Sequence, residues 1–145
     1  MVWIKNIVEE LFVRHGSRDP FVIASLLNID VHLTDLHDEI NGLYKYDRRN
    51  KYIVINNNLP EEMQRVVCAH ELGHAILHSR ANTTFMRNNT LLSVDRIEVE
   101  ANTFAAELLI PDDFLTDSKF STVYEIASLH NVPTEIAELK CRGLF

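Results

Sequence analysis

The stretch CAHELGHAILH, residues 68–78, constrains the fold most strongly because it sets histidines one helical turn apart within an apolar segment. On a helical wheel, His70 and His74 share one sector with apolar residues, and a second apolar face lies beside it. The two faces consist of Met63, Val66, Val67 and Leu77, and of Leu72, Ile76, Cys68 and Ala69. The sequence therefore predicts a helix that is buried on two sides, with imidazoles withdrawn from water.

Withdrawn imidazoles need partners, and a metal ion can serve as one. Residues four apart on a helix lie nearly above one another, so His70 and His74 can direct their rings at one zinc ion. Glu71 is rotated away from that line, yet it is near enough to act as a general base on a water at the metal. The pattern His-Glu-x-x-His thus indicates metal-dependent hydrolysis. The alternative interpretation is a buried helix whose histidines are only hydrogen-bonded.

A catalytic zinc site usually has three protein ligands and keeps a fourth position for water. The metzincin pattern is absent, because residues 75–77 continue the helix and His78 follows too soon to be its third histidine. We expect His78 to support the site rather than to bind the metal. The helix expected over 97–110 carries three further carboxylates beside its apolar stripe. They are Glu98, Glu100 and Glu107, and wheel geometry does not choose among them.

The other patterns predict an α+β fold in one domain, residues 1–145, with a small three-stranded antiparallel sheet packed against several helices. Helices are expected over 2–14, ended by Gly16, and from Pro20 onward, capped by Asp19. Strand patterns cover 29–33, 43–46 and 52–56, and the last two form a hairpin. The segment 80–94 is expected to be a long loop.

Two capping boxes mark the helices that carry the candidate site. Asn58 with Glu61 begins the motif helix, which we expect to run to about Ser79. Asp95 with Glu98 begins the next helix, which Pro111 ends. In the tail, residues 119–145 are expected to form two short helices in a helix-turn-helix-like unit, split near 131–133, with Gly143 at a C-cap.

Charge and composition exclude several other classes of protein. The formal charge of −7 repels phosphate backbones, and the only dense basic cluster is Lys45, Arg48, Arg49 and Lys51. The first residues contain no uninterrupted apolar run, so we expect neither a signal peptide nor a membrane span, and a cytoplasmic location. Two cysteines far apart in sequence, Cys68 and Cys141, are expected to be free thiols.

The segment HELGHAILH followed by EVEANTFAAELLIP resembles the ImmA/IrrE family of zinc metallopeptidases, in which a His-Glu-x-x-His helix precedes a Glu-Ala-Asn helix. The resemblance implies a zincin-like fold and bound Zn²⁺. It implies that Glu100, directly before Ala-Asn, is the third metal ligand. It also implies that the strand before the motif helix, residues 52–56, lies at the sheet edge and pairs with an extended substrate. Members of the family act in phage, mobile-element or stress regulation, typically as anti-repressors that cleave a helix-turn-helix repressor.

The mechanism that we expect is hydrolysis of a peptide bond by water that Glu71 deprotonates, with zinc held by His70, His74 and Glu100. The partner is a separate repressor protein, and neither nucleic acid nor membrane is expected to bind directly. Candidate donors to the oxyanion are Tyr44, Tyr46 and His78. Two alternatives remain open. One is a non-catalytic zinc-stabilised module that sequesters a repressor, and the other is a DNA-binding regulator that uses its C-terminal helices, although Glu125, Glu135 and Glu138 outnumber Lys140 there.

Overall fold

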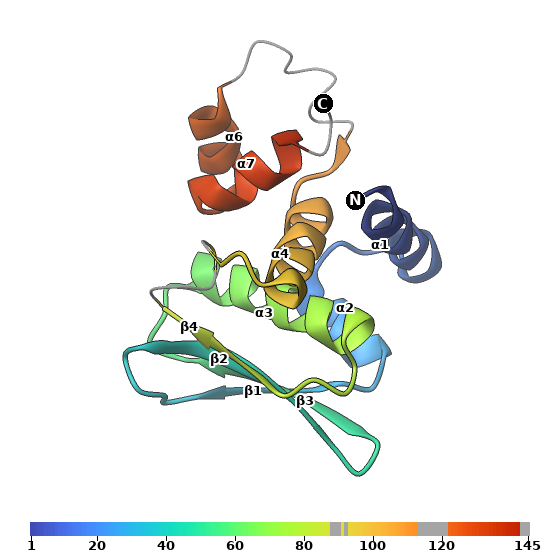
Figure 1. The fold of residues 1–145 in the computed structure, drawn as a ribbon, viewed down its shortest axis with the longest axis vertical. Coiled ribbons are helices and arrows are strands. Elements are labelled where there is room, and N and C mark those ends of the chain that lie inside the picture. Colours follow the sequence, from blue (N-terminus) through green and yellow to red (C-terminus); the bar gives the residue numbers. More distant parts are fainter. Residues whose placement is uncertain (88–90, 92, 113–121, 143–145) are drawn as a thin grey trace.

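A computed structural model of the chain describes residues 1–87, 91, 93–112 and 122–142. It has an α+β fold, as the sequence predicts (Figure 1). The helices are α1 (Val2–His15), α2 (Pro20–Leu26), α3 (Glu61–Leu77), α4 (Arg96–Leu109), α6 (Val123–His130) and α7 (Thr134–Arg142). The strands are β1 (Asp30–Thr34), β2 (Ile40–Asp47), β3 (Asn50–Asn56) and β4 (Thr83–Met86).

The sheet differs from the predicted one in size and direction. Its four strands lie in the order β1-β3-β2-β4, and β1 runs parallel to β3 while the other pairs are antiparallel. The prediction of three antiparallel strands is therefore wrong. The additional strand, β4, lies inside the segment 80–94 that was expected to be a loop. At four residues it is too short to show a period, and only its pairing with β2 makes it a strand.

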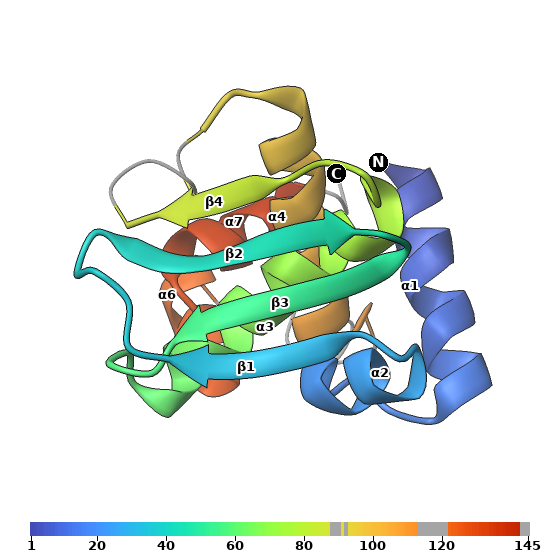
Figure 2. The same cartoon turned by 90° about the horizontal axis from the view of Figure 1, so that it is seen from below.

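Strand β3 lies in the interior of the sheet, between β1 and β2 (Figure 2). The expectation that residues 52–56 form a substrate-binding edge is therefore wrong, because ladder hydrogen bonds occupy both sides of this strand. The edge strands are β1 and β4. The chain reverses from β2 into β3 at Arg48 and Arg49, both of which have positive φ, the twist that a two-residue hairpin turn requires.

The helix boundaries follow most of the predicted start and stop signals. Gly16 ends α1 in the left-handed conformation with φ 67°, and the Asp19 side chain accepts a hydrogen bond from the Phe21 N–H at the start of α2. The capping box of α3 is wrong, because α3 begins after Pro60 without a side-chain cap. The Asn58 amide instead donates to the side-chain oxygens of Asp35 and Asn56.

Helix α3 is the centre of the core and is covered on two sides, as its pattern predicts. Figure 1 shows α3 lying along the sheet, with α4 crossing it on the opposite side. Both the sheet and α4 approach α3 closely. A Cβ atom on Gly42 of β2 would lie 2.7 Å from Cγ1 of Val67, and one on Gly73 would lie 3.1 Å from Cβ of Phe104 in α4. The absence of a side chain at these two glycines therefore lets the sheet, α3 and α4 approach this closely.

The two C-terminal helices pack beyond α4, at the end of the molecule away from the sheet (Figure 1). They are separated at Asn131, which adopts a left-handed φ of 54°, as the predicted split requires. Lys140 of α7 is 1% exposed and pairs with Glu107 of α4 at 2.6 Å and with Asp112. This buried ion pair joins α7 to α4. The predicted unit over 119–145 and its Gly143 cap lie partly outside the described residues.

Both cysteines are free, as expected: Cys68 is buried in α3 and Cys141 is half-buried in α7. Burial raises the pKa of the Cys68 thiol, so this side chain behaves as a small apolar group in the core. Within the described ranges, no helix has both the length and the apolar character needed to cross a membrane.

Candidate metal centre

Helices α3 and α4 bring four polar side chains together in the core. His70 and His74 project from α3 toward Glu98 of α4. Oε2 of Glu98 lies 3.1 Å from Nε2 of His70, and Oε1 of Glu98 lies 3.1 Å from Nε2 of His74. Glu71 lies beside them, with Oε1 3.6 Å from Nε2 of His70. His70, Glu71 and His74 are fully buried, so this polar cluster is largely withdrawn from water.

The outer nitrogen of each ring is hydrogen-bonded, and this fixes which nitrogen faces the centre. Oδ1 of Asn102 lies 2.7 Å from Nδ1 of His70, so Nδ1 is the donor and carries the hydrogen. Nδ1 of His74 lies 3.0 Å from Nδ1 of His78. In a neutral imidazole with its hydrogen on Nδ1, the Nε2 atom carries a lone pair. The lone pair of His70 is therefore directed at Glu98.

The facing atoms lack hydrogen-bond partners within the part of the chain that the structure describes. They are Nε2 of His70, Nε2 of His74, Oε2 of Glu98 and both carboxylate oxygens of Glu71. Leaving such groups buried and unpaired is costly. A metal ion between the two nitrogens and the Glu98 carboxylate would satisfy them, and two imidazoles with one carboxylate are a common set of zinc ligands. The residues present therefore fit a zinc ion.

The protonation states of the cluster also suit metal binding. Burial lowers the pKa of His70, which keeps this ring neutral as a ligand must be. For Glu98, burial acts to raise the pKa, but the close contacts of its carboxylate with the rings of His70 and His74 outweigh burial and lower the pKa to about 2. Glu98 is therefore an anion. Burial raises the pKa of Glu71 well above its ordinary value, and the neighbouring charge of Glu98 raises it further.

The structure separates the three carboxylates that the sequence left as candidates. Oε1 of Glu100 lies 2.8 Å from Nε2 of His78 rather than beside His70 and His74. Glu107 faces Lys140. Of the three, only Glu98 meets both histidines of the motif. Its placement favours Glu98 over Glu100 as the third ligand.

Wheel geometry left Glu98 as one of three candidate carboxylates, and the family resemblance pointed to Glu100 instead. Asp95 is indeed the N-cap residue of α4, but no side chain caps the helix and Glu98 turns toward α3 instead. A usable signal was present. Glu98 and Asn102 are one helical turn apart, as are His70 and His74, so two parallel pairs can meet across one helix interface.

The suggested oxyanion donors lie in different surroundings. The hydroxyl of Tyr44 donates to the backbone oxygen of Ser79, and burial raises the pKa of Tyr44 to about 12. The ring of Tyr46 packs against the core, and the Arg80 guanidinium lies 6.0 Å from its centroid. Tyr44 is therefore committed to a backbone contact, and His78 to the ring of His74.

Strand β4 borders the cluster. The ring centroid of Phe85, in β4, lies 4.3 Å from that of His70. β4 is an edge strand of the sheet, so this edge lies next to the histidines (Figure 2).

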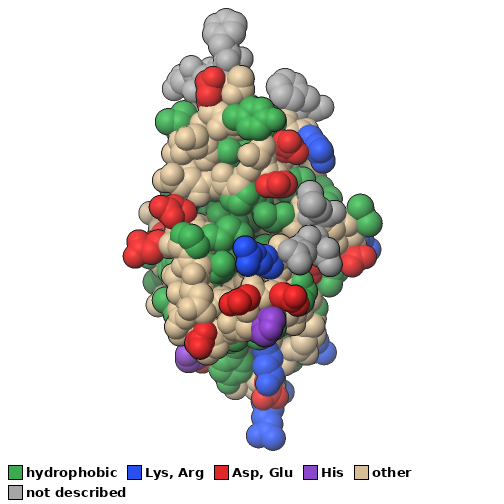
Figure 3. All heavy atoms as spheres, turned by 90° about the vertical axis from the view of Figure 1, so that its left-hand side faces the viewer, with side chains coloured by type: hydrophobic (Ala, Val, Ile, Leu, Met, Phe, Trp, Pro, Cys, Tyr) green, Lys and Arg blue, Asp and Glu red, His purple; other side chains and the backbone are tan. Residues whose placement is uncertain are grey.

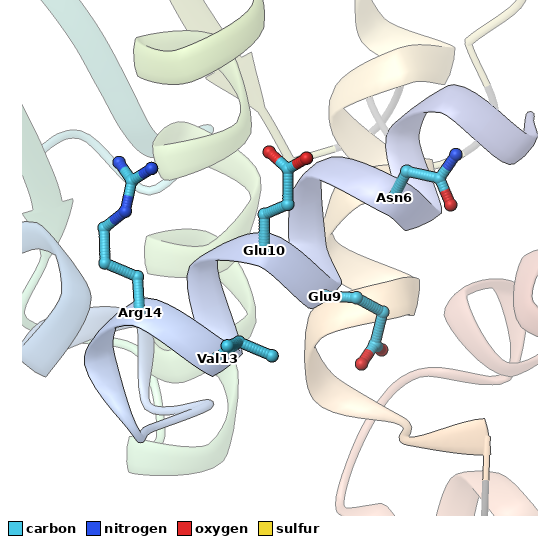
Figure 4. A pocket seen from close by; sticks show the side chains of 5 residues that line it. All are labelled: Asn6, Glu9, Glu10, Val13 and Arg14. Atoms are coloured by element: carbon cyan, nitrogen blue, oxygen red, sulfur yellow. The ribbon is translucent and has the colours of Figure 1, made fainter.

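Two other surface features lie away from the cluster. A pocket on the outer side of α1 is lined by Asn6, Glu9, Glu10, Val13 and Arg14 (Figure 4). Figure 3 shows one face with acidic side chains scattered over the helical part and basic side chains toward the tip where the β2–β3 turn projects. That tip contains Arg48 and Arg49 of the basic cluster.

Comparison with known proteins places these features in a family. Residues 24–142 match the model of the IrrE N-terminal-like domain, a peptidase family with a zincin-like fold. The chain is 52% identical over 139 residues to "Uncharacterized immunity region protein 2" of Bacillus phage phi105, covering 94% of the chain and 88% of that protein. It is 31% identical over 141 residues to "Metallopeptidase ImmA" of Bacillus subtilis (strain 168), covering 94% of the chain and 83% of that protein.

Proposed function

The chain belongs to the ImmA/IrrE family of metallopeptidases, and from this premise we propose that it is a zinc-dependent endopeptidase whose metal is held by His70, His74 and Glu98. The observation that carries the proposal is that the Glu98 carboxylate lies 3.1 Å from Nε2 of both His70 and His74, with the buried Glu71 carboxylate grouped with the two histidines. A cation at the point between these atoms would offset the cost of burying them.

The residues of the site divide the chemistry among them. A zinc ion bound there supplies a Lewis acid that polarises the peptide carbonyl and makes water a stronger acid. Glu71 accepts a proton from the attacking water, whose oxygen forms a bond to the carbonyl carbon. When the C–N bond breaks, Glu71 returns that proton to the leaving amine. A raised pKa suits this role, because the carboxyl group must hold the proton between the two steps.

The substrate is proposed to be a separate helix-turn-helix repressor. The names of the two relatives, a metallopeptidase and a phage immunity-region protein, support a role in the control of phage or mobile-element genes. The net charge of −7 favours a basic protein partner, and DNA-binding repressors are basic. An extended segment of the repressor would pair with the edge of β4, beside His70.

The two alternatives are disfavoured by particular contacts. A purely structural zinc site is closed by four protein ligands and has no use for Glu71, whose burial without a hydrogen-bond partner among the described residues is costly. A DNA-binding role for α6 and α7 needs exposed basic residues. Lys140 is instead buried against Glu107 and Asp112, and Glu135 and Glu138 occupy the same helix.

The test is a cleavage assay with the purified protein and the repressor encoded next to its gene. We expect about one zinc per chain by mass spectrometry and discrete repressor fragments. Glu71→Gln should keep the zinc and abolish the fragments, while Glu62→Gln, an exposed glutamate of the same helix, should cleave normally. Intact repressor with zinc-loaded wild-type protein would contradict the proposal, as would normal cleavage by Glu71→Gln.

A further inference from the structure

The geometry around His74 points to a positioning pair: we propose that His78 and Glu100 orient His74 toward the metal and strengthen it as a ligand. This inference rests on the proposed zinc site. It gives a role to Glu100, whose carboxylate contacts His78, and to His78, the third histidine of the motif. The contacts form a chain from Glu100 to His78 to His74.

With both imidazole rings neutral, one arrangement of hydrogens satisfies the whole chain of contacts. The Glu100 carboxylate, 2.8 Å from Nε2 of His78, accepts, so this nitrogen must be the donor. In the neutral ring, Nδ1 of His78 is then an acceptor, and it lies 3.0 Å from Nδ1 of His74. His74 must donate from Nδ1, which leaves the lone pair of its Nε2 directed at Glu98. The carboxylate thereby selects the tautomer of His74 that can bind a metal.

The surrounding structure holds both residues in place. His78 occupies the C-cap position of α3, where its backbone N–H donates to the backbone oxygen of His74 at 2.8 Å. The side chains of His78 and Glu100 are 9% and 10% exposed, so little water competes for their hydrogen bond. Arg96, one turn before Glu100 in α4, lies 3.6 Å from the other carboxylate oxygen but is 86% exposed. Its interaction is therefore weak, and Glu100 acts mainly on His78.

The two histidines of the motif are supported differently. His70 donates to a neutral amide, that of Asn102, whereas His74 donates to an imidazole that is itself bonded to a carboxylate. Partners of this kind fix ring orientation and raise the basicity of a ligand, and their loss typically lowers metal affinity by about 10- to 100-fold. Removing either His78 or Glu100 should therefore weaken zinc binding without removing a ligand.

The experiment measures the zinc dissociation constant of the full chain by competition with a chelator. His78→Ala and Glu100→Ala should each weaken binding by about ten-fold or more. The double variant should be no weaker than His78→Ala, because Glu100 acts through His78. His78→Asn should recover affinity, since its side-chain oxygen can accept from Nδ1 of His74. His32→Ala, at an exposed histidine of β1, is the matched control and should bind as the wild type does.

A second measurement separates positioning from folding. With Co²⁺ as probe, the visible absorption spectrum should change in His78→Ala and Glu100→Ala, while thermal unfolding of the metal-free variants should remain close to that of the wild type. If His78→Ala unfolds at a lower temperature than the wild type, the zinc affinities of His78→Asn and Glu100→Gln carry the test, because both variants keep a polar side chain at the substituted position.

The outcomes distinguish failure of the positioning pair from failure of the proposed zinc-dependent endopeptidase. Unchanged zinc affinity in His78→Ala and Glu100→Ala overturns the positioning pair and leaves the protease proposal intact. Loss of stoichiometric zinc in Glu100→Ala, with normal binding in His78→Ala and Glu98→Ala, overturns it as well, because Glu100 is then a direct ligand. Absence of zinc binding by the wild-type protein refutes the proposed function itself.

Discussion

Replacing Gly73 with alanine tests whether the contact between α3 and α4 holds the proposed metal site together. Gly73 lies between His70 and His74 in the motif, on the side of α3 that faces α4. An added Cβ would lie 3.1 Å from Cβ of Phe104, 3.2 Å from Cα of Ala101 and 3.2 Å from the Ala101 carbonyl oxygen. Carbon atoms in good contact are about 3.5–4.0 Å apart, so the two carbon contacts are too short by a few tenths of an ångström, and the contact with the oxygen is also tight.

Two effects of opposite sign decide the result. Alanine is favoured over glycine inside a helix by about 1 kcal/mol. Overpacking typically costs about 1–3 kcal/mol. The contacted atoms are the backbone of α4 and a Cβ attached to it, which cannot rotate away as a flexible side chain can. We therefore expect the packing cost to prevail, with a net loss of about 1 kcal/mol in the free energy of unfolding.

The added Cβ should push α4 away from α3, and this movement should also weaken zinc binding. Glu98 is carried by α4, so moving α4 away from α3 moves the carboxylate away from both histidines. The assay is urea unfolding of the metal-free protein, together with chelator competition for zinc. Ser128→Ala, at an exposed position of α6, reports the gain from helix propensity alone. A Gly73→Ala protein that is more stable by about 1 kcal/mol and binds zinc normally would refute the close-contact reasoning.

Three further predictions concern the rest of the core. Gly42→Ala should lower the free energy of unfolding, measured in urea, by about 3 kcal/mol, because its Cβ would lie 2.7 Å from both the Val54 carbonyl oxygen and Cγ1 of Val67. A decrease of less than about 0.5 kcal/mol would contradict this close approach. Lys140→Met should lower the free energy of unfolding by about 3–5 kcal/mol, because it leaves Glu107 buried without its partner. The double variant with Glu107→Gln should recover part of that stability. An unchanged unfolding midpoint in the single variant would disprove the interaction between Lys140 and Glu107. Burial acts to raise the pKa of Asp112, but hydrogen bonds from Lys140 and Lys5 outweigh it and lower the pKa below the ordinary 3.8. The stabilisation from Asp112 is therefore fully present above about pH 4 and is lost as the pH falls through the lowered pKa. The difference in unfolding free energy between the wild type and Asp112→Asn should therefore disappear in acid. A difference that does not depend on pH would contradict this.

Local patterns predicted the helices well and the sheet less well. The helices follow from apolar periodicity and from signals such as Gly16 and Asp19, which act within a few residues. The hairpin of β2 and β3 is local too. Strand β4 was missed because its pairing with β2 joins segments about forty residues apart, and four residues carry too little pattern to reveal it. The interior position of β3 has the same cause, since its pairing with β1 is also non-local.

The metal centre shows the same division between local and tertiary information. The spacing of His70 and His74 by itself determined that two imidazoles lie on one side of a buried helix, because that depends only on helical geometry. Which carboxylate meets them depends on the rotation of α4 about its own axis and on its position along α3. The close packing of Gly73 against Phe104 and Ala101 sets both. Only the tertiary structure therefore brought Glu98 to the histidines and placed Glu100 against His78.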